Sequence, residues 1–139
     1  MTDPTAAKKI LIIDDDQGFA LALSRFLEKA GYVVRRAENG EEGLRMAARE
    51  FPDLILLDFM MPIKTGFEVC QELRLIPGLC TVPVIVLTAF GQNIGEIHGL
   101  RQDETGAQVH AVLEKPIEPN VLLERMEEAL SHQAQPGGV

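Results

Sequence analysis

Short apolar runs alternate along this chain with longer segments in which apolar residues recur every three or four positions. The runs cover residues 10–13, 32–34, 54–57, 84–87 and 111–113. The segment after the first run carries Phe19, Leu23 and Phe26 at helical spacing. Strands that alternate with helices favour a parallel sheet that is covered by helices. The pattern therefore predicts an α/β fold with five strands and about five helices.

Capping and turn residues indicate where the predicted helices begin and end. Gly31 is expected to end the first helix, and Asn39 followed by Glu42 is a variant of the capping box that opens the second. A third helix is predicted over about 65–75. The last helix begins near Pro119, because proline is already shaped for a first helical turn.

The length and composition of the chain indicate a single globular domain. The 139 residues are enough for one buried core, which we place in residues 8–132 between disordered tails at 1–7 and 133–139. A net charge of −8 argues against direct nucleic-acid binding. No apolar run approaches the ~20 residues of a membrane span, and no signal peptide is expected. A cytoplasmic protein is expected, with Cys70 and Cys80 as reduced thiols.

Polar residues follow four of the apolar runs. Asp14, Asp15 and Asp16 follow the first run, Asp58 follows the third, and Thr88 and Lys115 follow the last two. In an open parallel sheet, ligands bind beyond the carboxyl ends of the strands. We therefore expect these side chains to converge on one site.

The residue types at this predicted site suit phosphoryl transfer. Clustered carboxylates repel one another unless a cation lies among them, and Mg²⁺ favours oxygen ligands. A carboxylate can also act as the nucleophile and become an aspartyl phosphate. Other roles remain open for individual residues, because Asp16 suits a helix cap and Thr88 suits any strand. Lys115 is harder to explain structurally, since a lysine is costly to bury without an anionic partner.

Four segments of the chain resemble the receiver domains of two-component response regulators. They are IIDDD at 12–16, LDFMMPIKTG at 57–66, LTA at 87–89 and EKP at 114–116. The resemblance extends from about Lys8 to Ser131. It implies a flavodoxin-like doubly wound sheet with strand order 2-1-3-4-5 and helices on both faces.

The resemblance also implies a role for each polar residue at the strand ends. Asp58 would accept the phosphoryl group, while Thr88 and Lys115 would contact it. Mg²⁺ would be bound by Asp15, Asp58 and the backbone carbonyl of Met60, and Asp14 would complete the acidic pocket. The Lys115–Pro116 bond is expected to be cis.

The function implied is a phosphorylation-dependent switch. A histidine kinase or a histidine phosphotransfer protein would supply the phosphoryl group, and a downstream protein or output domain would bind the face of helix 4, strand 5 and helix 5. The domain would be no enzyme beyond catalysing its own phosphorylation and slow dephosphorylation. It could stand alone or belong to a larger regulator. Two alternatives are a magnesium-dependent phosphohydrolase and an interaction module that needs no phosphate.

Several positions depart from the pattern that is common in receivers. Val112 occupies a site where many receivers have an aromatic switch residue, and strand alternation would point His110 the same way. Met60 and Phe90 flank the expected path of the attacking water, which neither can orient, so slow autodephosphorylation is predicted. Glycines at positions 91, 95, 99 and 106 predict a marginal fourth helix.

Overall fold

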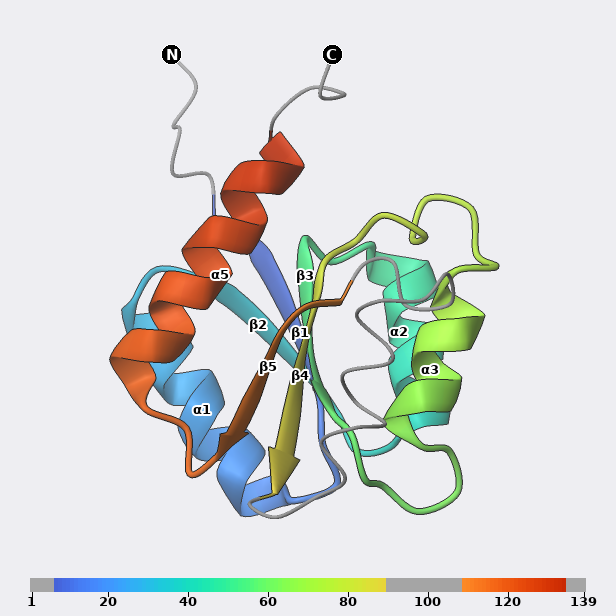
Figure 1. Cartoon of the computed structure of the whole chain (residues 1–139), viewed down its shortest axis with the longest axis horizontal. Coiled ribbons are helices and arrows are strands. Elements are labelled where there is room, and N and C mark those ends of the chain that lie inside the picture. Colours follow the sequence, from blue (N-terminus) through green and yellow to red (C-terminus); the bar gives the residue numbers. More distant parts are fainter. Residues whose placement is uncertain (1–6, 90–108, 135–139) are drawn as a thin grey trace.

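The protein is built on one parallel sheet, shown in Figure 1. The structure, a computed structural model, describes residues 7–89 and 109–134, the last three as backbone only. The five strands are β1 (Lys9–Ile13), β2 (Val33–Ala37), β3 (Leu54–Asp58), β4 (Val84–Ala89) and β5 (Val109–Lys115). All neighbouring pairs are parallel and the strand order is β2-β1-β3-β4-β5. The predicted doubly wound topology is confirmed.

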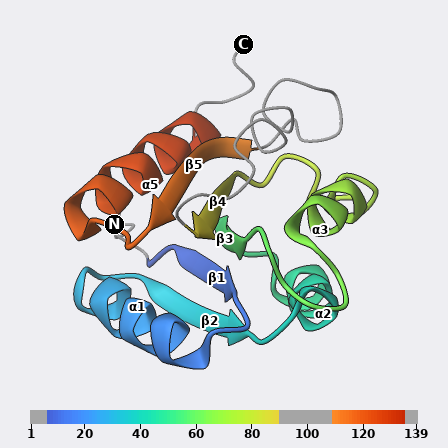
Figure 2. The same ribbon diagram turned by 60° about the horizontal axis from the view of Figure 1, so that its bottom comes forward.

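Helices cover both faces of the sheet, as Figures 1 and 2 show. One face carries α1 (Gln17–Lys29) and α5 (Pro119–Ala134), and the other carries α2 (Gly40–Glu50) and α3 (Gly66–Leu73). The α5 helix extends to Ala134, into the C-terminal tail that the sequence predicts at 133–139. The predicted fourth helix, with its glycines and Phe90, lies outside the described residues. Among the helices that are described, none is long and apolar enough to cross a membrane.

Alternate residues of the central strands enter two separate cores. Ile13 and Leu57 belong to the core under α2 and α3, whereas Ile12 and Leu56 belong to the core under α1 and α5. All four side chains are fully buried. Burying a side chain of this size contributes ~2 kcal/mol, so a shift of either strand by one residue would be costly. The cores therefore fix where β1 and β3 end, and with them the polar residues that follow.

Side-chain caps fix the starts of α1, α2 and α3. The Asp16 carboxylate accepts the Phe19 amide of α1 at 3.0 Å, and Asn39 caps α2, as predicted. Thr65 and Glu68 form a reciprocal capping box at α3. Such caps contribute ~1 kcal/mol each and set the angle at which a helix leaves its strand.

The β5 strand contains an irregularity that sequence alternation does not reveal. Val109 pairs with Val84, but Ala111 pairs with Ile85, so the register shifts at His110. His110 contacts Glu128 of α5 at 3.4 Å, whereas Val112 packs against the opposite core. The expectation that these two side chains point the same way is wrong, because a bulge inserts one residue between them.

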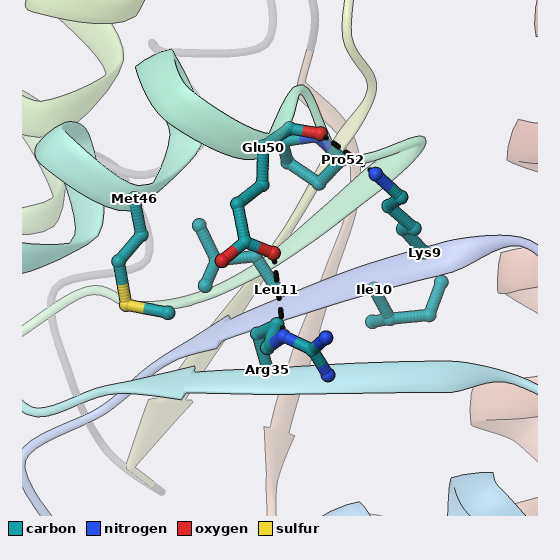
Figure 3. Close-up of a pocket in the computed structure, with 7 residues that line it drawn as sticks. All are labelled: Lys9, Ile10, Leu11, Arg35, Met46, Glu50 and Pro52. Carbon is teal, nitrogen blue, oxygen red and sulfur yellow. Dashed lines mark hydrogen bonds and ion pairs between the residues drawn. The ribbon is translucent and has the colours of Figure 1, made fainter.

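A small pocket lies at the amino end of β1, far along the strand from its carboxyl end (Figure 3). Its volume of about 10 Å³ is barely enough to admit one water molecule. Glu50 bridges the pocket through an ion pair with Arg35 at 3.3 Å and a bond from Lys9 Nζ to the Glu50 carbonyl. The pocket is a packing feature between α2 and the sheet.

Candidate functional site at the carboxyl ends of the strands

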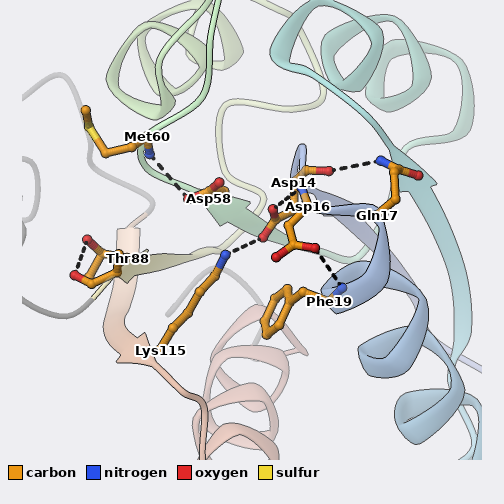
Figure 4. Close-up of polar contacts among 9 residues, drawn as sticks. Asp14, Asp16, Gln17, Phe19, Asp58, Met60, Thr88 and Lys115 are labelled. Atoms are coloured by element: carbon orange, nitrogen blue, oxygen red, sulfur yellow. Dashed lines mark hydrogen bonds and ion pairs between the residues drawn. The ribbon is translucent and has the colours of Figure 1, made fainter.

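Four strands deliver the predicted polar residues to one place, as Figure 4 shows. Asp14 follows β1, Asp58 ends β3, Thr88 lies at the end of β4 and Lys115 ends β5. The structure brings Asp14, Asp58 and Lys115 into one cluster, and Thr88 lies at the adjacent strand end. Asp14, Asp58 and Thr88 are buried, although each is polar. Buried polar groups in a sheet-end pocket need partners or a ligand.

Three carboxylates form the acidic part of this site. Oxygens of Asp14, Asp15 and Asp58 all lie within 4.8 Å of one another. Asp14 and Asp58 are buried and Asp15 is exposed, so the cluster opens toward solvent on one side. An all-oxygen donor set that keeps a solvent-facing side suits Mg²⁺, which retains several of its waters.

Asp14 is held rigidly by its neighbours. Its Oδ1 accepts the Asp16 amide at 2.8 Å, and its own amide donates to the Ala37 carbonyl at 3.2 Å. Its Oδ2 accepts Lys115 Nζ at 2.9 Å. The side chain is fully buried, so these three hydrogen bonds fix the direction in which its carboxylate points.

The environment of Asp58 favours its protonated form while no cation is bound. Burial raises the pKa of Asp58 to about 7, and the negative charge of Asp14 adds to this effect. The Lys115 ammonium and the Met60 amide, which donates to Asp58 Oδ1 at 3.3 Å, act in the opposite direction. A cation bound among the carboxylates would relieve the repulsion between Asp58 and Asp14.

Lys115 extends from β5 back into the acidic cluster. Its Nζ lies between the Asp14 carboxylate and the ring of Phe19, whose centroid is 4.3 Å away. The exposed fraction of its side chain is only 22%. The Lys115–Pro116 bond is cis, as expected. The predicted reason for a lysine at this strand end, an anionic partner, is present.

Thr88 lies at the adjacent strand end with its side chain fully buried. Its hydroxyl contacts the Ala89 carbonyl at 3.4 Å, a long and weak hydrogen bond. The hydroxyl is therefore easily redirected to a stronger acceptor.

The β3–α3 loop forms the rim of the site beside Asp58. Gly66 donates to the Phe59 carbonyl at 2.8 Å, and a Cβ at Gly66 would lie 2.9 Å from the Asp58 carbonyl. Only glycine permits this close return of the chain. Met60 and Ile63 are exposed on the loop, by 51% and 81%. The Met60 carbonyl stays a predicted ligand.

Sequence reasoning missed one member of the site. The helical spacing places Phe19 only on the apolar face of α1, yet its ring also lies against the Lys115 ammonium. Helical spacing does assign Phe19 to that face, since it packs against the core under α1 and α5. Its second contact depends on how β5 approaches α1, which no local pattern records.

The family of the chain follows from this site together with a match that spans most of the sequence. Residues 10–127 match the response regulator receiver domain family. The chain is a response regulator receiver domain. It therefore belongs to two-component signal transduction, and a phosphorylation switch at this sheet end fits that membership.

Known proteins similar to this receiver domain differ in length. The chain is 42% identical over 118 residues to the DNA-binding dual master transcriptional regulator RpaA of Synechocystis, covering 85% of this chain and 47% of RpaA. It is 38% identical over 123 residues to the regulator PhoP of Bacillus subtilis, covering 88% of this chain and 48% of PhoP. The chain thus spans about half of these regulators. It covers 98% of protein PilH of Pseudomonas aeruginosa, with 35% identity over 88% of this chain.

Solved structures show the same fold. A CheY-like receiver domain from Methanospirillum hungatei matches 95% of this chain and 100% of its own, with a TM-score of 0.82 and 30% identity. The chemotaxis protein CheY4 of Vibrio cholerae matches 89% of this chain and 99% of its own, with a TM-score of 0.80 and 28% identity. The flavodoxin-like assignment is confirmed.

Proposed function

We propose that Asp58 accepts a phosphoryl group from a phosphohistidine on a histidine kinase or a histidine phosphotransfer protein. The observation that carries the proposal is the environment of the Asp58 carboxylate: it is buried beside two other aspartates, with the Lys115 ammonium bonded to the same cluster. This environment raises the free energy of the unmodified carboxylate and offers a cation to an incoming phosphate.

The transfer is a substitution at phosphorus. An oxygen of the Asp58 carboxylate attacks, the new P–O bond forms, and the P–N bond to the donor imidazole breaks and leaves its electron pair on nitrogen. Lys115 Nζ is then within the cluster, where it can bind the equatorial phosphoryl oxygens. The Thr88 hydroxyl can exchange its weak bond to the Ala89 carbonyl for a phosphoryl oxygen.

Mg²⁺ is the cofactor that the residues fit best. Asp14, Asp15, Asp58 and the Met60 carbonyl would hold it, and when bound it would neutralise charge on the transferring oxygens. These donors are all oxygens, the ligand type that Mg²⁺ prefers. Lys115 supplies a second positive charge to the same cluster.

The output of the switch would depend on Thr88 and Lys115, which we propose follow the phosphoryl group. Both lie on the last two strands, and β5 contacts α5 through His110 and Glu128. Movement at these strand ends would shift the conformational population of the β5–α5 face, to which the predicted fourth helix would add. A downstream protein or an output domain would bind that face.

We propose further that the domain is no enzyme in its own right and that it acts in the cytoplasm without contacting DNA itself. The charge of −8 supports the last point. A phosphohydrolase is disfavoured because Met60 stands where such an enzyme would need a second acid. A module independent of phosphate is disfavoured because Asp14, Asp58 and Lys115 are assembled into one cluster.

The test is an intact-mass measurement after incubation with Mg²⁺ and acetyl phosphate. The wild type is expected to gain one phosphoryl group, which Asp58→Ala and omission of Mg²⁺ should each abolish. Asp53→Ala is the matched control, since Asp53 precedes the same strand that Asp58 ends. The proposal is wrong if Asp58→Ala is modified as fully as the wild type, or if neither protein is modified even by a panel of phosphohistidine donors.

A further inference from the structure

Lys115 needs contacts that keep its ammonium in the site when Asp14 binds a metal cation. Lysine has a flexible stem and presents a point charge, so it needs other groups to define its position. Asp14 Oδ2, at 2.9 Å, is one such group. Asp14 is also a member of the carboxylate cluster that suits a cation, and its bond to Lys115 would then weaken.

A second group faces the same ammonium. The ring centroid of Phe19 lies 4.3 Å from Lys115 Nζ, inside the range in which an aromatic face attracts a cation. Figure 4 shows the lysine chain reaching from β5 past this ring toward Asp14. A ring contact leaves N–H groups of the ammonium available for oxygens, and neither Mg²⁺ nor phosphate competes for it.

The ring is itself fixed by the start of α1. The Phe19 amide donates to the Asp16 cap at 3.0 Å, which anchors the first turn of the helix. The ring also packs against the core under α1 and α5. It lines an apolar groove between these two helices together with Phe26 and Ile117. Phe19 is therefore a rigid support beneath a flexible side chain.

We propose that Phe19 is a positioning residue that keeps the Lys115 ammonium over the acidic cluster for phosphoryl transfer. The proposal rests on the proposed function of Asp58, and it adds a contact that helps Lys115 to act. A smaller aliphatic residue at this position would fill the groove but would leave the ammonium free to swing into solvent.

The first measurement tests directly whether the Phe19 ring lies over the Lys115 ammonium, and it needs no phosphorylation. Protons next to Nζ that lie over a ring face are shifted upfield in NMR spectra by the ring current. We expect this shift in the wild type and in Phe19→Tyr, which keeps the ring, and we expect its loss in Phe19→Leu and Phe19→Met. Phe26→Leu is the matched control, because Phe26 lines the same groove on the same helix. An unchanged Lys115 spectrum in Phe19→Leu would overturn the proposal.

The second measurement is the rate of Asp58 phosphorylation by acetyl phosphate at saturating Mg²⁺. The cation–π contact is partly buried, and its loss should lower the rate about threefold to tenfold in Phe19→Leu and Phe19→Met. Phe19→Tyr and Phe26→Leu should stay within about twofold of the wild type. Equal loss in Phe26→Leu, or no loss in Phe19→Leu, would reduce Phe19 to a packing residue and contradict the proposal. A wild type that takes no phosphoryl group would contradict the proposed function of Asp58. The NMR measurement separates that failure from a failure of the Phe19 proposal, because it uses unphosphorylated protein.

Discussion

At the scale of single residues, Asp58 combines two properties that normally exclude each other: it is buried, and its nearest charged neighbours include another carboxylate. Its pKa is raised to about 7, chiefly by burial and then by Asp14. Lys115 compensates only in part, since its closest bond is to Asp14. The residue is costly to the unmodified fold and is poised to react or to bind a cation.

This pKa predicts how the metal-free protein responds to pH. Because Asp58 holds its proton more tightly in the folded chain than in the unfolded chain, it favours folding at low pH, and this contribution is lost as the pH rises from about 4 to about 7. Asp58→Asn should therefore gain stability relative to the wild type over that window, by on the order of 4 kcal/mol at its upper end. Urea unfolding in a chelator at several pH values measures it. A stability difference that does not change with pH would contradict the assignment.

The same proton competes with Mg²⁺. If the cation displaces the Asp58 proton, its apparent affinity should fall roughly tenfold for each pH unit below 7, and it should level off above. Calorimetric titration at pH 5, 6, 7 and 8 tests this expectation. Affinity that is constant across the series would show that Asp58 takes no part in binding.

We predict that Met60 lengthens the lifetime of a phosphoryl group on Asp58. Its amide lies 3.3 Å from Asp58 Oδ1 and its side chain is exposed, but a thioether is too weak an acceptor to orient water. Met60→Asn should therefore speed acyl-phosphate hydrolysis, by roughly tenfold. Decay is followed by mass after removal of the donor. Ile63→Asn introduces the same side chain further along the loop and should leave the rate unchanged; acceleration by both variants would refute a specific role for Met60.

At the scale of the elements, the packing of each helix on the sheet determines where the strand ends and their polar residues lie. The α2 helix lies so close to β1 that a Cβ on Gly43 would lie 2.5 Å from Ile13 Cδ1. Ile13 immediately precedes Asp14. A side chain added at Gly43 would therefore displace the residue that precedes Asp14.

Two helical glycines give a matched comparison of this effect. Gly43→Ala should destabilise the protein by about 1–3 kcal/mol through overpacking against Ile13. Gly18→Ala should instead stabilise it by about 0.5–1 kcal/mol, because the nearest atom to the added methyl group, Asp16 Oδ1, is 3.7 Å away and alanine favours the helix. Thermal and chemical unfolding measure both. If Gly43→Ala left stability unchanged or raised it, the close α2–β1 contact would be refuted.

The sequence predicted those elements whose cause is local. Strand ends at Asp14 and Asp58, the Asp16 and Asn39 caps and the strand order follow from apolar runs, cap residues and family motifs. The bulge at His110 and the contact of Phe19 with Lys115 were not predictable in this way. Both depend on how segments distant in the chain meet, and neither residue type departs from what its own element would contain.

At the scale of the whole molecule, one sheet carries two tasks on two separate sets of residues. The apolar residues of β1 and β3 divide between the cores on the two faces, and the polar residues just past the strand ends form the site. Because the cores fix the strands in register, the carboxylates are held together despite their repulsion. In this receiver domain, the stability of the two cores offsets the repulsion within the acidic cluster.

The measurement that tests the central claim most directly is the location of the phosphoryl group. After phosphorylation with acetyl phosphate and Mg²⁺, borohydride converts an aspartyl phosphate into homoserine, which peptide mass mapping then assigns to a residue. We predict homoserine at Asp58 alone, and none when Mg²⁺ is left out. Homoserine at Asp14 or Asp15, or labelling that is equal without Mg²⁺, would contradict the account.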